Sequence, residues 1–207
     1  RRYGKYLFVR LGDEGRWLHI HFGMTGRLQY YESAGKEPEH ARVVASFANG
    51  FHLAVDCQRL FGAVGLAEDP LAFAEKKGLG PDALDIQRGE FVDRLKDRRG
   101  SVKSALMNQA VIAGIGNIYS DEILFQARVR PDRSVSALDR STLEKLWHTS
   151  REILEAAIEA RADVERLPAD WLLSHSSEGE QCPACQGRVS SKKIAGRRSY
   201  FCPSCQG

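Results

Sequence analysis

The chain has 207 residues, of which 43% are hydrophobic, and it carries a formal net charge of +3. This length and apolar content suffice for one or two folded cores. No stretch approaches the roughly 18 consecutive apolar residues of a membrane helix, and no secretory signal opens the chain. We therefore expect a cytoplasmic protein that makes no membrane contact.

The first 80 residues have the pattern of an antiparallel β-sheet protein. Short runs of β-branched and aromatic residues alternate with turn residues, and the expected strands are 5–11, 17–22, 41–47 and 52–55. Asn49-Gly50 is a strong hairpin turn between the last two of these strands. We predict an antiparallel β-sandwich domain at residues 1–80. Because the chain enters directly on a strand, we expect this sandwich to be truncated at its N-terminus.

The stretch 103–133 is predicted to form two helices joined by a glycine-rich turn. An apolar-faced helix at 104–109 is followed by Gly114 and Gly116, which tolerate backbone angles that cost other residues energy. Asn117 is predicted to cap the next helix. A turn that points backbone N–H groups and an Asn amide outward is a site for an anion, such as a DNA phosphate.

The second of these helices also has recognisable charge and stop signals. Asp121 and Glu122 fall early in it, where negative charge suits the positive end of the helix dipole, and Pro131 is expected to end it.

The rest of the region 81–175 is predicted to be helical as well. The Gly80-Pro81 step is the best linker in the chain, and helical spacing follows at 89–98. A long amphipathic helix is expected from Asp139 to about Arg161. Its apolar stripe consists of Leu143, Leu146, Trp147, Ile153, Leu154 and Ile158.

Four of the five cysteines form two CxxC pairs within residues 176–207. They are Cys182, Cys185, Cys202 and Cys205, and 16 residues separate the pairs. In a cytosolic protein such pairs favour a metal over disulfides, and the span between them suits a β-hairpin. Four thiolates predict one structural zinc ion, with iron as the main rival. The remaining cysteine, Cys57, is expected to be a buried thiol.

The basic residues are bunched along the sequence. One group flanks the central turn and a second lies near the C-terminus: Lys103, Arg128, Arg130 and Arg133, then Arg188, Lys192, Lys193, Arg197 and Arg198. Two basic clusters with little acid between them favour a polyanionic partner.

The residue identities of the central stretch are more specific than its pattern of helices and turn. LMNQxxxAGIGNIYSDEILF resembles the helix–two-turn–helix segment of the formamidopyrimidine-DNA glycosylase and endonuclease VIII family, and IYSDE is nearer the formamidopyrimidine branch. The resemblance implies that Asn117, in the turn with Gly116, and Lys103 on the preceding helix grip phosphates beside a damaged nucleotide.

Motifs in the first 80 residues resemble the same family. The resemblance implies a phosphate contact for Lys5. It also implies a DNA-facing turn from His21, whose Met24 fills the gap left by a flipped base. Arg59 and Phe61 resemble the residues that pair with the orphaned base and wedge into the stack. The spacing before Arg59 is one residue longer than usual in the family, so the register of this loop is open.

Near the C-terminus, Arg197 matches the arginine of the family's hairpin that touches phosphates around the lesion. Arg198 is the alternative if the register shifts by one. The segment 165–173 differs from the Gly-Thr-rich loop that closes over the flipped base in the formamidopyrimidine branch. The resemblance therefore does not extend to the preference for 8-oxoguanine.

Together the motifs predict an α+β protein in three parts. These are a truncated antiparallel β-sandwich at 1–80, an all-α helix–two-turn–helix domain at 81–175, and a zinc-ribbon β-hairpin at 176–207. The resemblance implies a base-excision repair DNA glycosylase and AP lyase that flips oxidised bases out of damaged duplex DNA and cuts by β,δ-elimination. We expect it to be a monomer, associated with the nucleoid through DNA.

The family's nucleophile, an N-terminal proline amine, and the glutamate after it have no counterpart in this sequence, which begins Arg1-Arg2-Tyr3. No catalytic residue is therefore assigned, and we expect the chain as given to be inactive. Two alternatives stay open. One is a non-catalytic protein that binds damaged or abasic DNA, and the other is an unrelated zinc-ribbon protein that makes protein–protein contacts.

Overall fold

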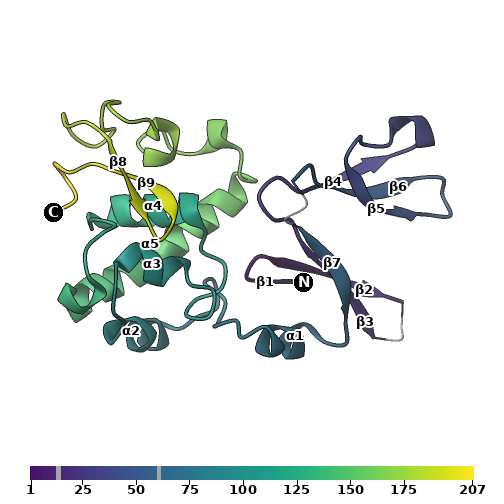
Figure 1. The fold of residues 1–207 in the computed structure, drawn as a ribbon, viewed down its shortest axis with the longest axis horizontal. Helices are drawn as coiled ribbons and strands as arrows, with labels where there is room; N and C mark the ends of the chain where they lie inside the picture. Colours follow the sequence, from purple (N-terminus) through teal and green to yellow (C-terminus); the bar gives the residue numbers. More distant parts are fainter. Residues whose placement is uncertain (13–14, 60–61) are drawn as a thin grey trace. The chain divides into compact units, whose positions relative to one another are not determined.

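The computed structural model describes residues 1–12, 15–59 and 62–207. The chain forms two compact units, Arg1–Gly78 and Leu79–Gly207 (Figure 1). It is an α+β protein with antiparallel sheets, as predicted. The division into three parts at residues 80 and 175 remains a prediction, because the C-terminal hairpin lies within the second unit. Among the described helices, none is long and apolar enough to cross a membrane.

The first unit contains two antiparallel sheets. The four-stranded sheet has the order β1-β2-β3-β7, with β1 at Arg2–Tyr3, β2 at Tyr6–Leu11, β3 at Arg16–His21 and β7 at Ala63–Ala67. The three-stranded sheet has the order β4-β6-β5, with β4 at Arg27–Tyr31, β6 at His52–Asp56 and β5 at Ala41–Ser46. A short 3-10 helix, η1, lies at Ala34–Lys36.

Strands β4 and β7 were not predicted from the sequence. β7 reads Ala-Val-Gly-Leu-Ala, which has few residues of high strand propensity. It is a strand because it pairs with β3 along its whole length, from Ala63 opposite His21 to Ala67 opposite Trp17. This pairing matters for the site because it secures one side of the strand that ends at His21.

Helix α1 (Pro70–Lys76) contacts the four-stranded sheet through aromatic rings. Its Phe73 lies 4.4 Å from the ring of His19, 5.0 Å from Tyr6 and 5.5 Å from Phe8. The helix was also missed from the sequence, although its start carries a standard signal. The Asp69 carboxylate accepts hydrogen bonds from the N–H groups of Leu71 and Ala72, and proline occupies the first turn.

The second unit is built mainly from helices. They are α2 (Arg88–Lys96), α3 (Val102–Met107), α4 (Asn117–Ala127) and α5 (Arg140–Glu159), with 3-10 helices η2 (Val135–Ala137), η3 (Val164–Arg166) and η4 (Leu172–His175). The hairpin of β8 (Ser190–Ile194) and β9 (Arg197–Phe201) completes the unit. Its core includes Leu106, Ile123, Leu124 and Leu146, all with no exposed surface.

Helix α4 differs from its prediction at both ends. Gly116, not Asn117, occupies the capping position, and Asn117 is the first helical residue. The Asn117 side chain is engaged elsewhere, because its amide reaches the hairpin. The helix ends at Ala127 with Arg128 in the left-handed conformation (φ 63°), so it stops before Pro131.

The acidic pair in α4 also has a different role from the one predicted. Asp121 and Glu122 are 6% and 1% exposed, and neither lies in the first turn of the helix. Each accepts a hydrogen bond from a later segment of the chain, so they connect α4 to its neighbours instead of compensating its dipole at the surface.

Helix α5 follows its prediction at the start and departs from it near the end. Asp139 caps it by accepting from the N–H of Thr142, and Leu143, Leu146 and Ile153 are buried. Ile158, placed in the apolar stripe, is instead 58% exposed, whereas Ala157 beside it is buried.

Candidate nucleic-acid interface and metal centre

The glycine turn between α3 and α4 is organised by one glutamine side chain. The Gln109 Oε1 atom accepts from the N–H of Gly114 at 3.0 Å, and its Nε2 group donates to the carbonyls of Met107 (2.8 Å) and Ile115 (2.9 Å). Gly114 has φ 119°, a conformation that favours glycine. Sequence reasoning did not single out Gln109, although it lies within the motif that carries the resemblance.

Asn117 joins this turn to the C-terminal hairpin. Its Nδ2 group donates to the backbone carbonyl of Arg198 at 3.1 Å, while its Oδ1 atom is buried without a hydrogen-bond partner in the described part of the chain. An amide NH₂ has two hydrogens, so one remains available to an external acceptor. Arg197, the neighbouring residue on the hairpin, has an exposed side chain. The structure therefore brings together two of the predicted phosphate-binding residues.

Lys103 occupies a different environment from the one expected of a direct phosphate contact. It has no exposed surface, and its Nζ atom donates to Asp121 Oδ1 at 2.7 Å and to the Arg198 carbonyl at 3.5 Å. Its burial depends on the hairpin, which lies far away in the sequence. Lys103 thus contacts Asp121 and the hairpin backbone from inside the unit, whereas a direct phosphate contact would need an exposed ammonium group.

The Lys103–Asp121 pair is shaped by its burial. Desolvation lowers the pKa of Lys103 and raises the pKa of Asp121, and the attraction between the two groups opposes both shifts. Asp121 also accepts from the Ser199 hydroxyl at 2.5 Å and from the Tyr200 N–H at 3.1 Å. Three donors around one carboxylate favour its charged form, so we describe the pair as an ion pair.

The first unit places three predicted residues close together. Lys5 is exposed in the turn between β1 and β2, and His21 ends β3. Burial, and then the charge of Lys5, lower the pKa of His21. The Nδ1 atom of His21 accepts from the N–H of Gly23 at 3.1 Å, and Met24, in the same turn, is 65% exposed.

The turn that carries Met24 has a steric requirement for glycine at its end. A Cβ atom at Gly26 would lie 2.3 Å from the carbonyl oxygen of Phe22, whose carbonyl accepts from the Gly26 N–H. Arg59 is exposed in the turn after β6, and the prediction for Phe61 lies outside the described residues.

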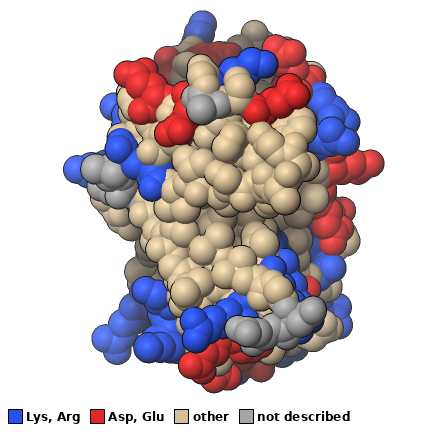
Figure 2. Space-filling view, turned by 90° about the vertical axis from the view of Figure 1, so that its right-hand side faces the viewer, with Lys and Arg blue, Asp and Glu red and all other residues tan. Residues whose placement is uncertain are grey.

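The basic clusters are partly neutralised by acidic neighbours. Asp132 pairs with both Arg130 and Lys192, at 3.1 and 2.8 Å. Figure 2 shows a broad uncharged area on one face, bordered by Lys and Arg together with Asp and Glu. In the hairpin, the side chains of Arg197 and Arg198 are exposed.

The four predicted metal ligands converge on one point. Their sulfur atoms all lie within 4.8 Å of one another, with Cys182 and Cys205 Sγ 3.8 Å apart and Cys185 and Cys202 Sγ 3.6 Å apart. Four sulfurs about 2.3 Å from a tetrahedral ion lie roughly 3.8 Å from each other. The arrangement fits a zinc ribbon, and these residues could hold a metal ion.

Backbone N–H groups donate to individual sulfurs of the cluster and favour the thiolate there. The Gly187 N–H donates to Cys185 Sγ at 3.3 Å. At Cys202, burial raises the pKa, but the N–H groups of Cys205 and Ser204, together with the sulfurs of Cys185 and Cys182, lower the pKa to about 7. At Cys205, burial and the neighbouring sulfurs raise the pKa to about 12. The centre packs on α4, because Phe125 and Leu172 belong to the same buried cluster as Cys182 and Cys202.

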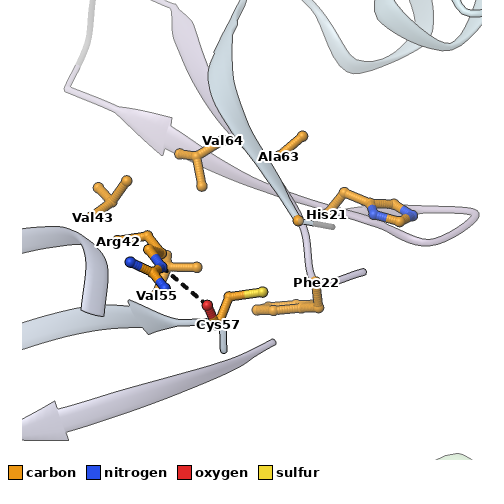
Figure 3. A pocket seen from close by; sticks show the side chains of 9 residues that line it. His21, Phe22, Arg42, Val43, Val55, Cys57, Ala63 and Val64 are labelled. Atoms are coloured by element: carbon orange, nitrogen blue, oxygen red, sulfur yellow. Dashed lines mark hydrogen bonds between the residues drawn. The ribbon is translucent and has the colours of Figure 1, made fainter. Parts of the chain in front are cut away.

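The first unit also contains a cavity of about 200 Å³ between its two sheets (Figure 3). Its lining includes Phe22, Val55 and Val64, and the Arg42 guanidinium donates to the Cys57 carbonyl at 3.1 Å. In Figure 3 the Phe22 ring and the Cys57 sulfur lie close to each other, while the His21 ring points away from the group. The cavity is a mainly apolar part of the sandwich interior and carries no paired acid and base among the residues that line it.

Comparisons with known proteins agree on one family. The model of the formamidopyrimidine-DNA glycosylase N-terminal domain matches residues 1–64, and that of the formamidopyrimidine-DNA glycosylase H2TH domain matches residues 78–167. The formamidopyrimidine-DNA glycosylase of Pelotomaculum thermopropionicum is 35% identical over 99% of this chain and 79% of its own length. That of Solibacter usitatus is 36% identical over 100% of this chain and 79% of its own length.

Solved structures show the same similarity. Lactococcus lactis Fpg in complex with DNA containing an abasic site has a TM-score of 0.88 and 29% identity, covering 100% of this chain and 80% of that one. MutM in complex with DNA containing carbocyclic 8-oxo-G has a TM-score of 0.89 and 27% identity over the same shares. With the glycine turn and the four-cysteine hairpin in place, these matches show that the chain belongs to the formamidopyrimidine-DNA glycosylase and endonuclease VIII family.

Proposed function

We propose that this protein acts in base-excision repair as a DNA glycosylase that binds damaged double-stranded DNA and takes the damaged base out of the stack. The observation that carries the proposal is the junction of the glycine turn with the hairpin, where the Asn117 amide and the exposed Arg197 come from adjoining elements. A neutral amide donor beside a guanidinium suits the phosphates of one strand.

The proposed DNA contacts come from both units. They are Lys5, His21, Met24, Arg59 and Phe61 in the first unit, and Gly116, Asn117 and Arg197 in the second. Exposed Met24 suits the role of an apolar wedge between bases, because its unbranched side chain fits irregular space. Lys103 is proposed to act through Asp121 and the Arg198 carbonyl, on account of its burial.

We further propose that the metal is one structural zinc ion. The four-sulfur set and its spacing support zinc, and four protein ligands leave no open position for chemistry. The four cysteines would hold the ion, and it would join the segment before β8 to the segment after β9. The hairpin then holds the Arg198 carbonyl against Asn117, so the metal acts on DNA binding through the position of the hairpin.

We also propose AP lyase activity, which is supported by the family membership. In solution we propose a monomer that associates with the nucleoid in the cytoplasm. No residue of the described chain is assigned as the nucleophile, because the amine and glutamate that the family uses have no counterpart in the sequence.

Fluorescence anisotropy on a duplex with one abasic site tests the DNA-binding proposal. We expect Asn117→Ala and Arg197→Ala each to weaken binding by roughly tenfold, the loss of one charge-assisted contact. Arg140→Ala, which removes an exposed arginine of α5, serves as the control and should bind like the wild type. The logarithm of the binding constant should fall with the logarithm of salt, by roughly 0.9 per phosphate neutralised. A flat salt response, or equal losses in all three variants, would contradict the proposal.

Borohydride trapping on the same duplex tests the lyase step. A Schiff base between a protein amine and the abasic sugar becomes a stable adduct on reduction. For these 207 residues we expect binding without a trapped adduct. A trapped adduct would show that an amine in this chain performs the step.

A further inference from the structure

Asp121 gathers three donors from two separate elements. Its Oδ1 atom accepts from Lys103 on α3 at 2.7 Å and from the Ser199 hydroxyl on β9 at 2.5 Å. Its Oδ2 atom accepts from the Tyr200 N–H at 3.1 Å. Because Asp121 is only 6% exposed, these contacts do not compete with bulk water. The carboxylate therefore ties the α3–α4 pair to one short stretch of the hairpin.

The residue next to that stretch contacts the proposed DNA-binding turn. The Arg198 carbonyl accepts from Asn117 Nδ2 at 3.1 Å and lies 3.5 Å from Lys103 Nζ. Arg198 is followed directly by Ser199, which Asp121 holds. Asp121 therefore fixes the position of the Arg198 carbonyl through Ser199, and the Asn117 amide donates to this carbonyl.

The hydrogen bonds of Asp121 are not needed merely to attach the hairpin to α4. Phe125, Leu172 and the buried cysteines already pack the hairpin onto α4 through apolar contact. A buried ion pair carries a large desolvation cost and is often no more stabilising than apolar residues of similar volume. Hydrogen bonds, however, fix direction, which apolar packing does not.

We propose that Asp121 is a positioning residue that, through Ser199 and the Arg198 carbonyl, orients the Asn117 amide for DNA phosphate. This inference rests on the proposed function. It also gives a role to the buried Lys103, whose charge favours the ionised form of Asp121 and whose Nζ donates to the same carbonyl as Asn117.

A double-mutant cycle on DNA affinity tests this connection. The variants are Ser199→Ala, Asn117→Ala and the double variant, measured on a duplex with one abasic site. Ser191→Ala is the matched control, because its hydroxyl lies on the other strand of the same hairpin and donates to exposed Glu178. Metal content and the urea midpoint of every variant are measured, so that only folded, metal-loaded protein is compared.

We expect Ser199→Ala to weaken binding about fivefold, as loss of a hydrogen bond to a charged group. In the Asn117→Ala background the same change should cost less than about twofold, because the group it orients is gone. Asp121→Asn, where it folds, should behave like Ser199→Ala. If Ser199 and Asp121 only stabilise the fold, their substitution will lower the urea midpoint, but the effects on DNA affinity at positions 199 and 117 will not be coupled.

The outcomes separate the two proposals. Wild-type protein that does not bind the abasic duplex overturns the proposed function. If the wild-type protein binds, two results overturn only the role of Asp121. One is that Ser199→Ala and Ser191→Ala have the same DNA affinity. The other is that Ser199→Ala weakens DNA binding equally in the wild-type and Asn117→Ala backgrounds.

Discussion

The neighbours of His21 determine which ring nitrogen carries its proton. Its ring lies 4.9 Å from Tyr6, and its Nδ1 atom accepts a hydrogen bond from the Gly23 N–H. A ring nitrogen that accepts carries no proton, so the neutral ring has its proton on Nε2. Burial and the charge of Lys5 both disfavour a second proton. We therefore describe His21 as a neutral donor at pH 7.

The pKa of His21 provides a direct test. Since its pKa in the folded state lies below the ordinary value of 6.5, the stability that neutral His21 contributes is complete above that value and is lost as pH falls through the lower folded pKa. Lys5→Ala removes a positive neighbour and should raise the pKa of His21 part of the way back. NMR titration of the ring measures both values. Lys36→Ala is the control, and a His21 pKa that does not respond to Lys5→Ala would contradict the argument.

Met24 allows function to be separated from stability at one residue. Its side chain is 65% exposed, so Met24→Ala should change the free energy of unfolding by less than about 0.5 kcal/mol. Binding to abasic DNA should nevertheless weaken, because the wedge is lost. Leu71→Ala is a suitable control, since Leu71 is a similarly exposed apolar residue, 60%, on α1. Equal affinity of the two variants would remove Met24 from the proposed interface.

At the scale of elements, α4 acts as the anchor of two later segments. Asp121 holds the hairpin through Ser199 and Tyr200, and Glu122 accepts from the Leu173 N–H of η4 at 2.8 Å. Burial raises the pKa of Glu122, and its hydrogen bonds oppose that shift. Two consecutive carboxylates thus connect one helix to both the hairpin and the segment before it.

The buried ion pair makes a prediction about stability. Asp121→Asn leaves the Lys103 charge buried without its counter-ion, so unfolding should become easier by about 3–5 kcal/mol. Urea denaturation of the metal-loaded protein measures this change. Asp93→Asn is the matched control, because Asp93 and Lys96 form a pair at nearly the same distance, 2.8 Å, on the exposed face of α2, and its loss should have little effect. Similar losses in the two variants would show that burial of the Lys103–Asp121 pair is unimportant.

At the scale of the whole molecule, the four-cysteine cluster lies in the same unit as Asn117 and Arg197. The hairpin that contacts Asn117 is closed at its ends by the two CxxC pairs. Gln206 strengthens this closure, because its side chain accepts from the Cys202 N–H and donates to the Val129 carbonyl after α4, both at 2.8 Å.

Removal of the metal should therefore act on DNA binding without unfolding the first unit. Metal binding of this kind stabilises isolated fingers by roughly 10–16 kcal/mol, so a chelator should melt the hairpin. The Arg198 carbonyl would then leave Asn117, and DNA affinity should fall at least as far as in Arg197→Ala. Hydrogen exchange and anisotropy measure the two effects, with β2 and β3 as internal reference strands. Full affinity after chelation would show that the hairpin is not needed for binding.

Much of the fold was predictable because its signals are local. Asp139 caps α5 as expected, Gly114 adopts the backbone angles that favour glycine, and the strands around Asn49-Gly50 form a hairpin. The convergence of the four cysteines was predictable for the same reason, since the spacing within each CxxC pair dictates a turn. Strand β7 was not predictable, because its pairing with β3 outweighs its weak strand propensity.

The sequence by itself determined the family, the two CxxC pairs and the turn that carries Asn117, because these depend on residues close together in the chain. Only the tertiary structure decided that Lys103 is buried and that Asn117 reaches the hairpin instead of capping its helix. Lys103 lies 18 residues before Asp121, and Asp121 lies 78 residues before Ser199. The exposure of a lysine depends on what packs over it, and here the covering element comes from the far end of the chain.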